Sequence, residues 1–119
     1  MTEAEFREMA ARTRAKALAA EVFAYVRRTY GFTDLDLTSH RRLAQLIEAR
    51  KLVVRLLRAH GENWWSYPKI GRLLGGRHHT TIMYLDWSAN HLVGALPVFA
   101  RHCGDFACQW SSRENRHAA

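Results

Sequence analysis

The large apolar residues of this chain recur at intervals of three and four, in segments that glycine or proline separates. Such spacing places apolar side chains along one face of an α-helix. No stretch of useful length alternates apolar and polar residues as a half-buried strand does. With 119 residues, the chain has room for one domain with a modest core. The pattern therefore predicts an all-helical domain of five to seven helices.

Local start and stop signals mark the first three helices. Apolar spacing over residues 18–30 predicts a core helix, which Gly31 ends. Thr33 can cap a short second helix because its side chain accepts hydrogen bonds from the free amides of the first turn. Residues 43–60 carry apolar side chains at helical spacing up to Gly61, and they predict a third helix.

Three further helices follow in the second half of the chain. Ser66 can cap a helix with Pro68 in its first turn, where a missing amide hydrogen is tolerated. Glycines 75 and 76 close that helix, and another is predicted over residues 79–91. Pro97 lies in the first turn of a last helix.

The composition divides the chain into three parts. Residues 1–19 are rich in alanine, glutamate and arginine, and they predict an N-terminal extension that is helical or frayed. Residues 20–110 hold the apolar helices and form the domain proper. Residues 111–119 are polar and predict a disordered tail.

Positive charge is concentrated in the middle of the chain. The formal net charge is +7, and nine of the 18 basic residues but two of the 11 acidic ones lie between residues 41 and 79. A basic surplus of this kind favours a polyanionic partner and is uninformative about the fold.

Other features exclude several classes of protein. Cys103 and Cys108 have a spacing that suits neither a zinc knuckle nor a redox pair, and they predict buried or idle thiols in a reducing cytoplasm. The chain shows no signal peptide and no apolar run long enough for a membrane span. We expect a cytoplasmic protein with no cofactor, no metal and no membrane contact.

Residues 66–74 and 79–91 form two short helices joined by a glycine-containing turn, which predicts a helix-turn-helix. The second helix of that motif enters the major groove of DNA with its N-terminal residues against base edges. Residues 77–81, with the sequence Arg-His-His-Thr-Thr, occupy this position. Two alternatives stay open: a threonine only caps the helix, or the histidines are exposed without a role. A metal site is not expected, because adjacent helical residues point about 100° apart.

The stretch "SYPKIGRLLGGRHHTTIMY" resembles the signature of the C-terminal DNA-binding domain, domain IV, of the bacterial chromosomal replication initiator DnaA. That family typically reads S-x-P-x-I-G-x-x-F-G-G-R-D-H-T-T-V. Upstream, "SHRR" is similar to its basic loop, "ARKLVVRLLRAH" to the helix before the motif, and "VFAYVRRTYGFTDLDL" to its opening helices. The resemblance covers residues 20–92 and implies a multi-helical, Trp-repressor-like fold that binds double-stranded DNA.

The resemblance implies a role for each matching residue. The basic loop enters the minor groove, and Arg42 is its best match. Base contacts in the major groove fall on Arg77, His78, His79, Thr80 and Thr81. Phosphate contacts fall on Arg41, Arg50, Lys51, Arg58, Tyr67, Pro68, Lys69 and Arg72. Arg50 has an alternative role as a structural ion-pair partner.

The chain departs from the family pattern in three places. His78 replaces an aspartate, whose carboxylate can accept a hydrogen bond from cytosine N4, so the preferred DNA sequence is expected to differ. The turn before Ser66 is about two residues longer and carries Trp64 and Trp65, one expected in the core and the other either a contact surface or a cover for the turn. No phosphate-binding loop of an ATPase is present.

These observations predict a stand-alone, sequence-preferring double-stranded DNA-binding protein. It would regulate transcription or modulate events at initiator-type sites, and it would be a monomer or a homodimer. The alternative is a protein-interaction module that keeps the helix-turn-helix scaffold and binds a replication or transcription protein through Trp64 and Trp65 or the N-terminal extension. An enzyme is not expected, because no cluster of carboxylates accompanies the histidines.

Overall fold

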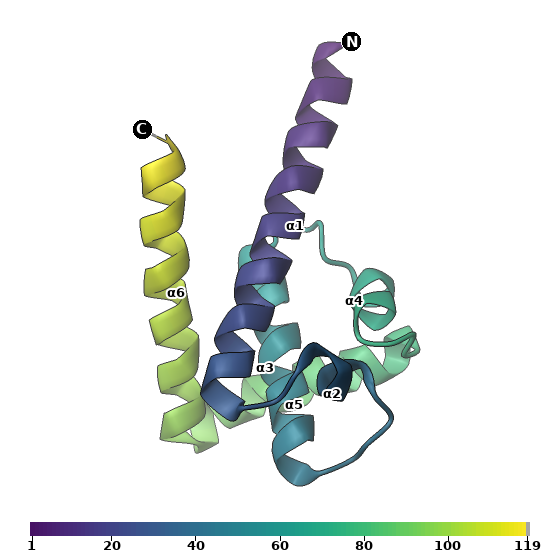
Figure 1. Ribbon diagram of the computed structural model, residues 1–119, viewed down its shortest axis with the longest axis vertical. Coiled ribbons are helices and arrows are strands. Elements are labelled where there is room, and N and C mark those ends of the chain that lie inside the picture. The colour runs from purple at the N-terminus through teal and green to yellow at the C-terminus, as the bar shows by residue number, and fades with distance from the viewer. Residues whose placement is uncertain (119) are drawn as a thin grey trace.

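A computed structural model describes residues 1–118 and shows six helices connected by short loops (Figure 1). They are α1 (Glu3–Tyr30), α2 (Asp34–Thr38), α3 (Ala44–His60), α4 (Tyr67–Leu73), α5 (His79–Ala95) and α6 (Pro97–Ala118). The all-helical prediction is confirmed, and the described residues contain no strand.

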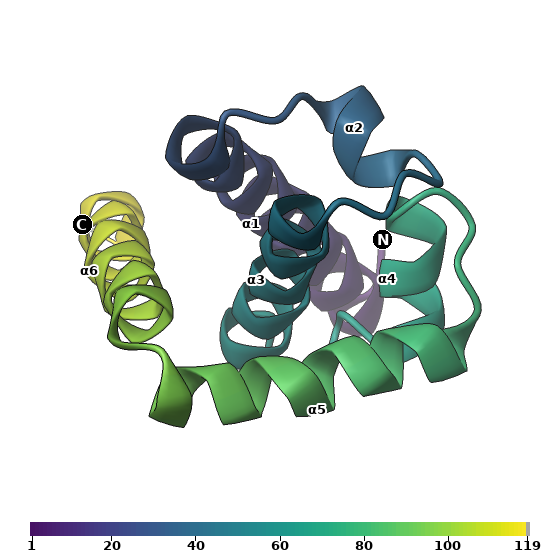
Figure 2. The same ribbon diagram turned by 90° about the horizontal axis from the view of Figure 1, so that it is seen from below.

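Helix α3 lies at the centre of the fold. It packs against α1, α5 and α6, while α4 packs against α5. Figure 2 shows α5 running across one end of the domain, past α3 and α4. Both α3 residues Val53 and Leu57 are fully buried, as are Val22 of α1 and Ile82 of α5. The apolar face of α3 therefore organises one core, to which most of the other helices contribute.

The expected local signals begin and end the helices. Thr33 and Asp36 form a capping box at the start of α2, and the side chain of Ser66 caps α4. Leu96 is extended, as expected for a residue before proline, and α6 begins at Pro97. Gly75 has φ +82° and lies so close to α2 that an added Cβ would sit 2.1 Å from the carbonyl oxygen of Thr38.

The N-terminal extension and the first core helix are one continuous helix. Helix α1 runs from Glu3, all of its residues before Ala15 are exposed, and burial begins at Ala15. Figure 1 shows this N-terminal half of α1 projecting beyond the body of the domain.

The predicted disordered tail differs from the structure, because α6 continues to Ala118; residue 119 lies outside the described residues. Polar contacts with α1 account for this extra helix. Glu114 accepts a hydrogen bond from Arg14, and Arg113 pairs with Glu21 at 3.5 Å. Trp110, one turn earlier, is buried. These partners lie about 90 to 100 residues away in the sequence, so no local pattern reveals them.

Within the described residues, none of the helices combines the length and the apolar character that crossing a bilayer requires. Both cysteines lie on α6 as free thiols.

Candidate nucleic-acid interface

Helices α4 and α5 are joined by a tight turn that brings their ends into contact. The amides of Gly76 and Arg77 both donate to the carbonyl oxygen of Gly71, each at 2.9 Å. A Cβ on Gly71 would lie 2.1 Å from the carbonyl oxygen of Arg77, so only glycine allows this approach. The close contact sets the angle at which α5 leaves the turn.

The N-terminal tip of α5 presents four exposed polar side chains, those of His78, His79, Thr80 and Thr81. His78 is the cap residue. Its Nδ1 accepts a hydrogen bond from the backbone amide of Thr80 at 3.3 Å and lies 2.8 Å from the Thr80 hydroxyl. The alternative in which a threonine caps the helix is therefore wrong. The ring centres of His78 and His79 lie 4.2 Å apart, with the ring planes tilted by 35°, so the two imidazoles are adjacent at the tip.

Arg50 is a buried structural residue. Only 3% of it is exposed, and its guanidinium donates to four backbone carbonyl oxygens at 2.7 to 3.0 Å. These acceptors belong to Asp36, Leu37, Ser39 and Arg41. The prediction of a phosphate contact at Arg50 does not fit this enclosed position, and the ion-pair alternative is also wrong because its partners are carbonyls. The guanidinium ties α3 to the end of α2 and to the loop between α2 and α3.

Arg77 is half-buried behind the tip. Its guanidinium donates to the carbonyl oxygens of Leu74 and Ser39, so it joins the helix-turn-helix to the same loop. Burial lowers the pKa of Arg77. The pKa of Arg50 is lowered to about 10, mainly by burial and to a smaller extent by the positive charge of Arg77 nearby. Two desolvated arginines therefore fix the position of the loop relative to α5.

The loop itself carries the arginine expected to enter a minor groove. Arg42 is exposed, whereas Arg41 lies 3.4 Å from Asp36 in a loose ion pair. Because Arg50 and Arg77 hold the loop from inside, the backbone that carries Arg42 is positioned before any ligand binds.

Arg58, Tyr67 and Asp86 form a polar cluster between α3, α4 and α5. The Tyr67 hydroxyl donates to Asp86 Oδ2 at 2.7 Å, and this hydrogen bond is the main cause of the raised pKa of Tyr67. Arg58 lies over the Tyr67 ring at 4.3 Å and 3.9 Å from the same carboxylate oxygen, and donates to the carbonyl of Trp65. Sequence reasoning missed this role of Asp86, because nothing local links residues 58, 67 and 86.

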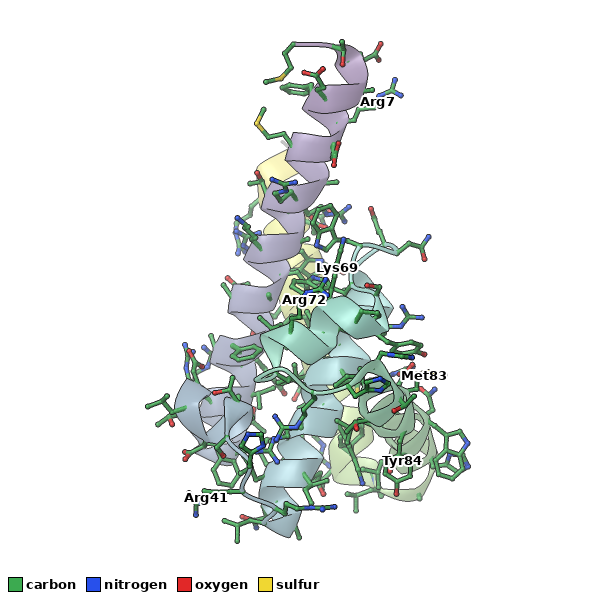
Figure 3. The ribbon with its side chains drawn as sticks, turned by 90° about the vertical axis from the view of Figure 1, so that its right-hand side faces the viewer. Arg7, Arg41, Lys69, Arg72, Met83 and Tyr84 are labelled. Atoms are coloured by element: carbon green, nitrogen blue, oxygen red, sulfur yellow. The ribbon has the colours of Figure 1, made fainter. Side chains whose placement is uncertain are left out.

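The remaining predicted phosphate contacts are exposed or half-buried and form no ion pair within the described chain. They are Lys51, Pro68, Lys69 and Arg72. Figure 3 labels Arg41, Lys69 and Arg72 on one side of the molecule. This side joins the α2–α3 loop to α4.

The two tryptophans of the longer turn have different environments. Trp65 is buried, and its indole nitrogen donates to the carbonyl oxygen of Ala15 at 3.2 Å, which confirms that one of the pair belongs to the core. Trp64 is half-buried, and the ammonium of Lys69 lies 3.6 Å from the centre of one of its rings.

This geometry is that of a helix-turn-helix protein: a short first helix, a glycine turn, and a second helix whose N-terminal tip is exposed and polar. Among the described residues, no group of three or more histidine, cysteine, aspartate or glutamate side chains is placed to hold a metal ion.

Residues 19–86 match the family described as "Bacterial dnaA protein helix-turn-helix", and the chain belongs to this family. Among its relatives is the chromosomal replication initiator protein DnaA of Brucella abortus, 35% identical over 75 residues, which cover 63% of this chain and 15% of the relative. The DnaA protein of a Picosynechococcus strain is 33% identical over 87 residues, 73% of this chain and 18% of the relative. The DnaA protein of a Bradyrhizobium strain is 34% identical over 95 residues, which cover 79% of this chain and 20% of the relative. The matched part thus spans a fifth or less of each relative.

Proposed function

We propose that this chain binds double-stranded DNA with a sequence preference, and that it acts in the cell at the nucleoid as a regulator of transcription or a modulator at initiator-type sites. Membership of the helix-turn-helix family supports DNA binding. The observation that carries the proposal is the exposed polar tip of α5, placed at the end of a helix-turn-helix beside an uncompensated basic surface.

In this proposal the tip enters the major groove. His79, Thr80 and Thr81 read base edges, because a hydroxyl can donate or accept and a threonine methyl can pack against the methyl of thymine. His78 contributes less to direct readout, since its Nδ1 is engaged in capping, but Nε2 remains free to meet a base or a phosphate.

Arg42 enters the adjacent minor groove from the loop that Arg50 and Arg77 hold. An arginine side chain suits this groove because its narrow, negative walls attract a guanidinium. The two buried arginines thus act as positioning residues, and Arg77 supports the tip from behind instead of reading bases.

Phosphate contacts in the proposed complex come from Arg41, Lys51, Pro68, Lys69 and Arg72. They hold the register of the protein on the duplex and supply affinity that falls with added salt. Arg58 and Tyr67 hold α4 against α5 through Asp86, and therefore act indirectly.

The decisive experiment is selection of binding sites from a random duplex library, followed by affinity measurements on the selected site. We expect one preferred sequence, and a palindrome would indicate a homodimer while a single half-site would indicate a monomer. His79→Ala with Thr80→Ala should weaken binding by about 1–3 kcal/mol per lost base contact while the fold stays intact. A double variant that binds the selected site as well as the parent contradicts the assignment of the tip.

A second candidate function is binding to a replication or transcription protein through α5. Met83, Tyr84 and Trp87 on this helix are 47%, 59% and 58% exposed, and the rings of Tyr84 and Trp87 stack at 6.1 Å. No lysine or arginine lies on α5. An exposed aromatic surface of this kind is typical of protein contacts. Affinity for duplex that does not fall steeply between low and moderate salt would favour this alternative.

A further inference from the structure

Four basic side chains gather around an open hollow between α1 and α4. The hollow has a volume of about 510 Å³ and is lined by Arg12 and Lys16 of α1, Lys69 and Arg72 of α4, and the side chains of Trp64, Trp65 and Leu73. No aspartate or glutamate of the part of the chain that the structure describes lines it. Figure 3 labels Lys69 and Arg72 on α4, which faces α1 across the hollow.

None of the four cations forms an ion pair with a carboxylate of the described chain. Other basic residues of α1 do: Arg7 pairs with Glu3, Arg14 with Glu62 and Glu114, and Arg27 with Asp34. Like charges that share one hollow repel each other, and this repulsion opposes folding. The arrangement therefore favours an anionic ligand that neutralises the group.

The cations are arranged in two rows. Arg12 and Lys16 are one helical turn apart on α1, and Lys69 and Arg72 are one turn apart on α4, so each pair shares a helix face. Trp64 restrains Lys69, whose ammonium lies over the indole at 3.6 Å while its positive charge stays unneutralised. Two positive rows on either side of a hollow suit a chain of phosphates better than a single small anion.

We infer that the hollow binds phosphates of the same duplex that the helix-turn-helix reads, and that α1 thereby carries the DNA interface past the recognition site. This inference rests on the proposed function, and its distinguishing claim is a role for Arg12 and Lys16. Lys69 and Arg72 belong to the first helix of the helix-turn-helix and make the hollow continuous with the proposed phosphate-binding surface. The longest dimension of the molecule is 46 Å, which corresponds to about 13 base pairs at about 3.4 Å per pair.

The test compares the parent with the double variant Arg12→Gln/Lys16→Gln. A matched control, Arg28→Gln/Arg101→Gln, removes two exposed charges that lie outside the hollow and form no ion pair among the described residues. Binding is measured by fluorescence anisotropy on duplexes that carry the selected site, with either flank shortened in steps, and over a range of salt concentrations. Far-UV circular dichroism checks that all three proteins are folded.

We expect the double variant to lower the slope of log affinity against log salt by about 1.8, at about 0.9 for each phosphate released. Between 0.05 and 0.2 M salt, the affinity of the parent should then fall about 12-fold more than that of the double variant. Shortening one flank of the duplex should lower the binding affinity of the parent and of the control but leave the affinity of the double variant unchanged.

If the double variant keeps the salt slope and the flank dependence of the parent, α1 does not contact DNA and the inference is overturned, while the helix-turn-helix assignment stands. The same holds if the control loses as much slope as the double variant, because the effect then belongs to net charge. If the parent binds no duplex at all, the proposed function fails and takes this inference with it.

Discussion

Replacing Arg50 by methionine tests whether a buried guanidinium fixes the loop that carries Arg42. The Arg50 side chain is 3% exposed and donates to four backbone carbonyl oxygens of residues 36–41. Methionine keeps an unbranched apolar stem of similar length but offers no hydrogen-bond donor. The substitution therefore removes the hydrogen bonds with little change in packing.

The size of the effect follows from how accessible each acceptor is. The hydrogen bond to Leu37 is buried, and leaving that carbonyl without a donor costs roughly 2 kcal/mol. The other three acceptors are partly buried, so water can replace the donor at a cost of about 0.5 kcal/mol each. Relief of the desolvation of Arg50 and of its repulsion with Arg77 offsets part of this loss. We expect a net destabilisation of about 3 kcal/mol, or about 10 °C in Tm.

Thermal and urea unfolding measure the loss of stability, and amide hydrogen exchange over residues 36–43 reports on the end of α2 and on the loop that follows it. Lys51→Met is the control, because it makes a similar change at the next position of α3, where the side chain is partly exposed, and should stay within about 0.5 kcal/mol of the parent. If Arg50→Met lowers Tm by less than about 2 °C, or leaves exchange in the loop unchanged, the role assigned to Arg50 is refuted.

Four further substitutions have defined outcomes. His78→Asp should raise the free energy of unfolding by about 0.5–1 kcal/mol, because a carboxylate is a better cap and suits the positive end of the helix. The same substitution should shift the DNA sequence that is selected. An unchanged melting temperature and an unchanged selected site contradict this. Gly71→Ala should destabilise the fold by at least about 2 kcal/mol, since its Cβ would lie 2.1 Å from a backbone oxygen across the turn. Gly94→Ala on α5 is the contrasting case, because its Cβ meets open space, and it should stabilise the fold by about 0.5–1 kcal/mol. Burial lowers the pKa of His60, so the folded state disfavours its protonation. The contribution of His60 to the free energy of unfolding is therefore fully present above its ordinary pKa of 6.5 and is lost as the pH falls below that value. His60→Gln should flatten the stability curve between about pH 7.5 and 5.5 relative to the parent, and parallel curves would contradict this.

Much of the helical framework was predictable because its signals are local. A cap such as Ser66, the glycine stop at Gly31 and the proline at residue 97 act within one turn of the residue that carries them. The helix-turn-helix was predictable for the same reason, since two short helices and their glycine turn occupy one continuous stretch.

The functional assignment of the arginines was only partly predictable. The sequence places Arg42, Arg50, Arg58 and Arg77 in one basic region, where all four are equivalent as positive charges. The structure leaves Arg42 exposed, buries Arg50, partly buries Arg77 and draws Arg58 toward Asp86. These differences depend on carbonyls and carboxylates that the chain brings near only when it folds.

The sequence by itself therefore determined most of the helical framework, the motif at residues 66–81 and the sign of the charge. Tertiary structure decided which arginines hold the loop, that α1 and α6 extend as paired helices, and that Arg12 and Lys16 lie beside Lys69 and Arg72. The physical reason is range. Helix caps and helical spacing depend on neighbours within about four residues. The environment of a charged side chain depends on groups that can be up to 100 residues away in the chain.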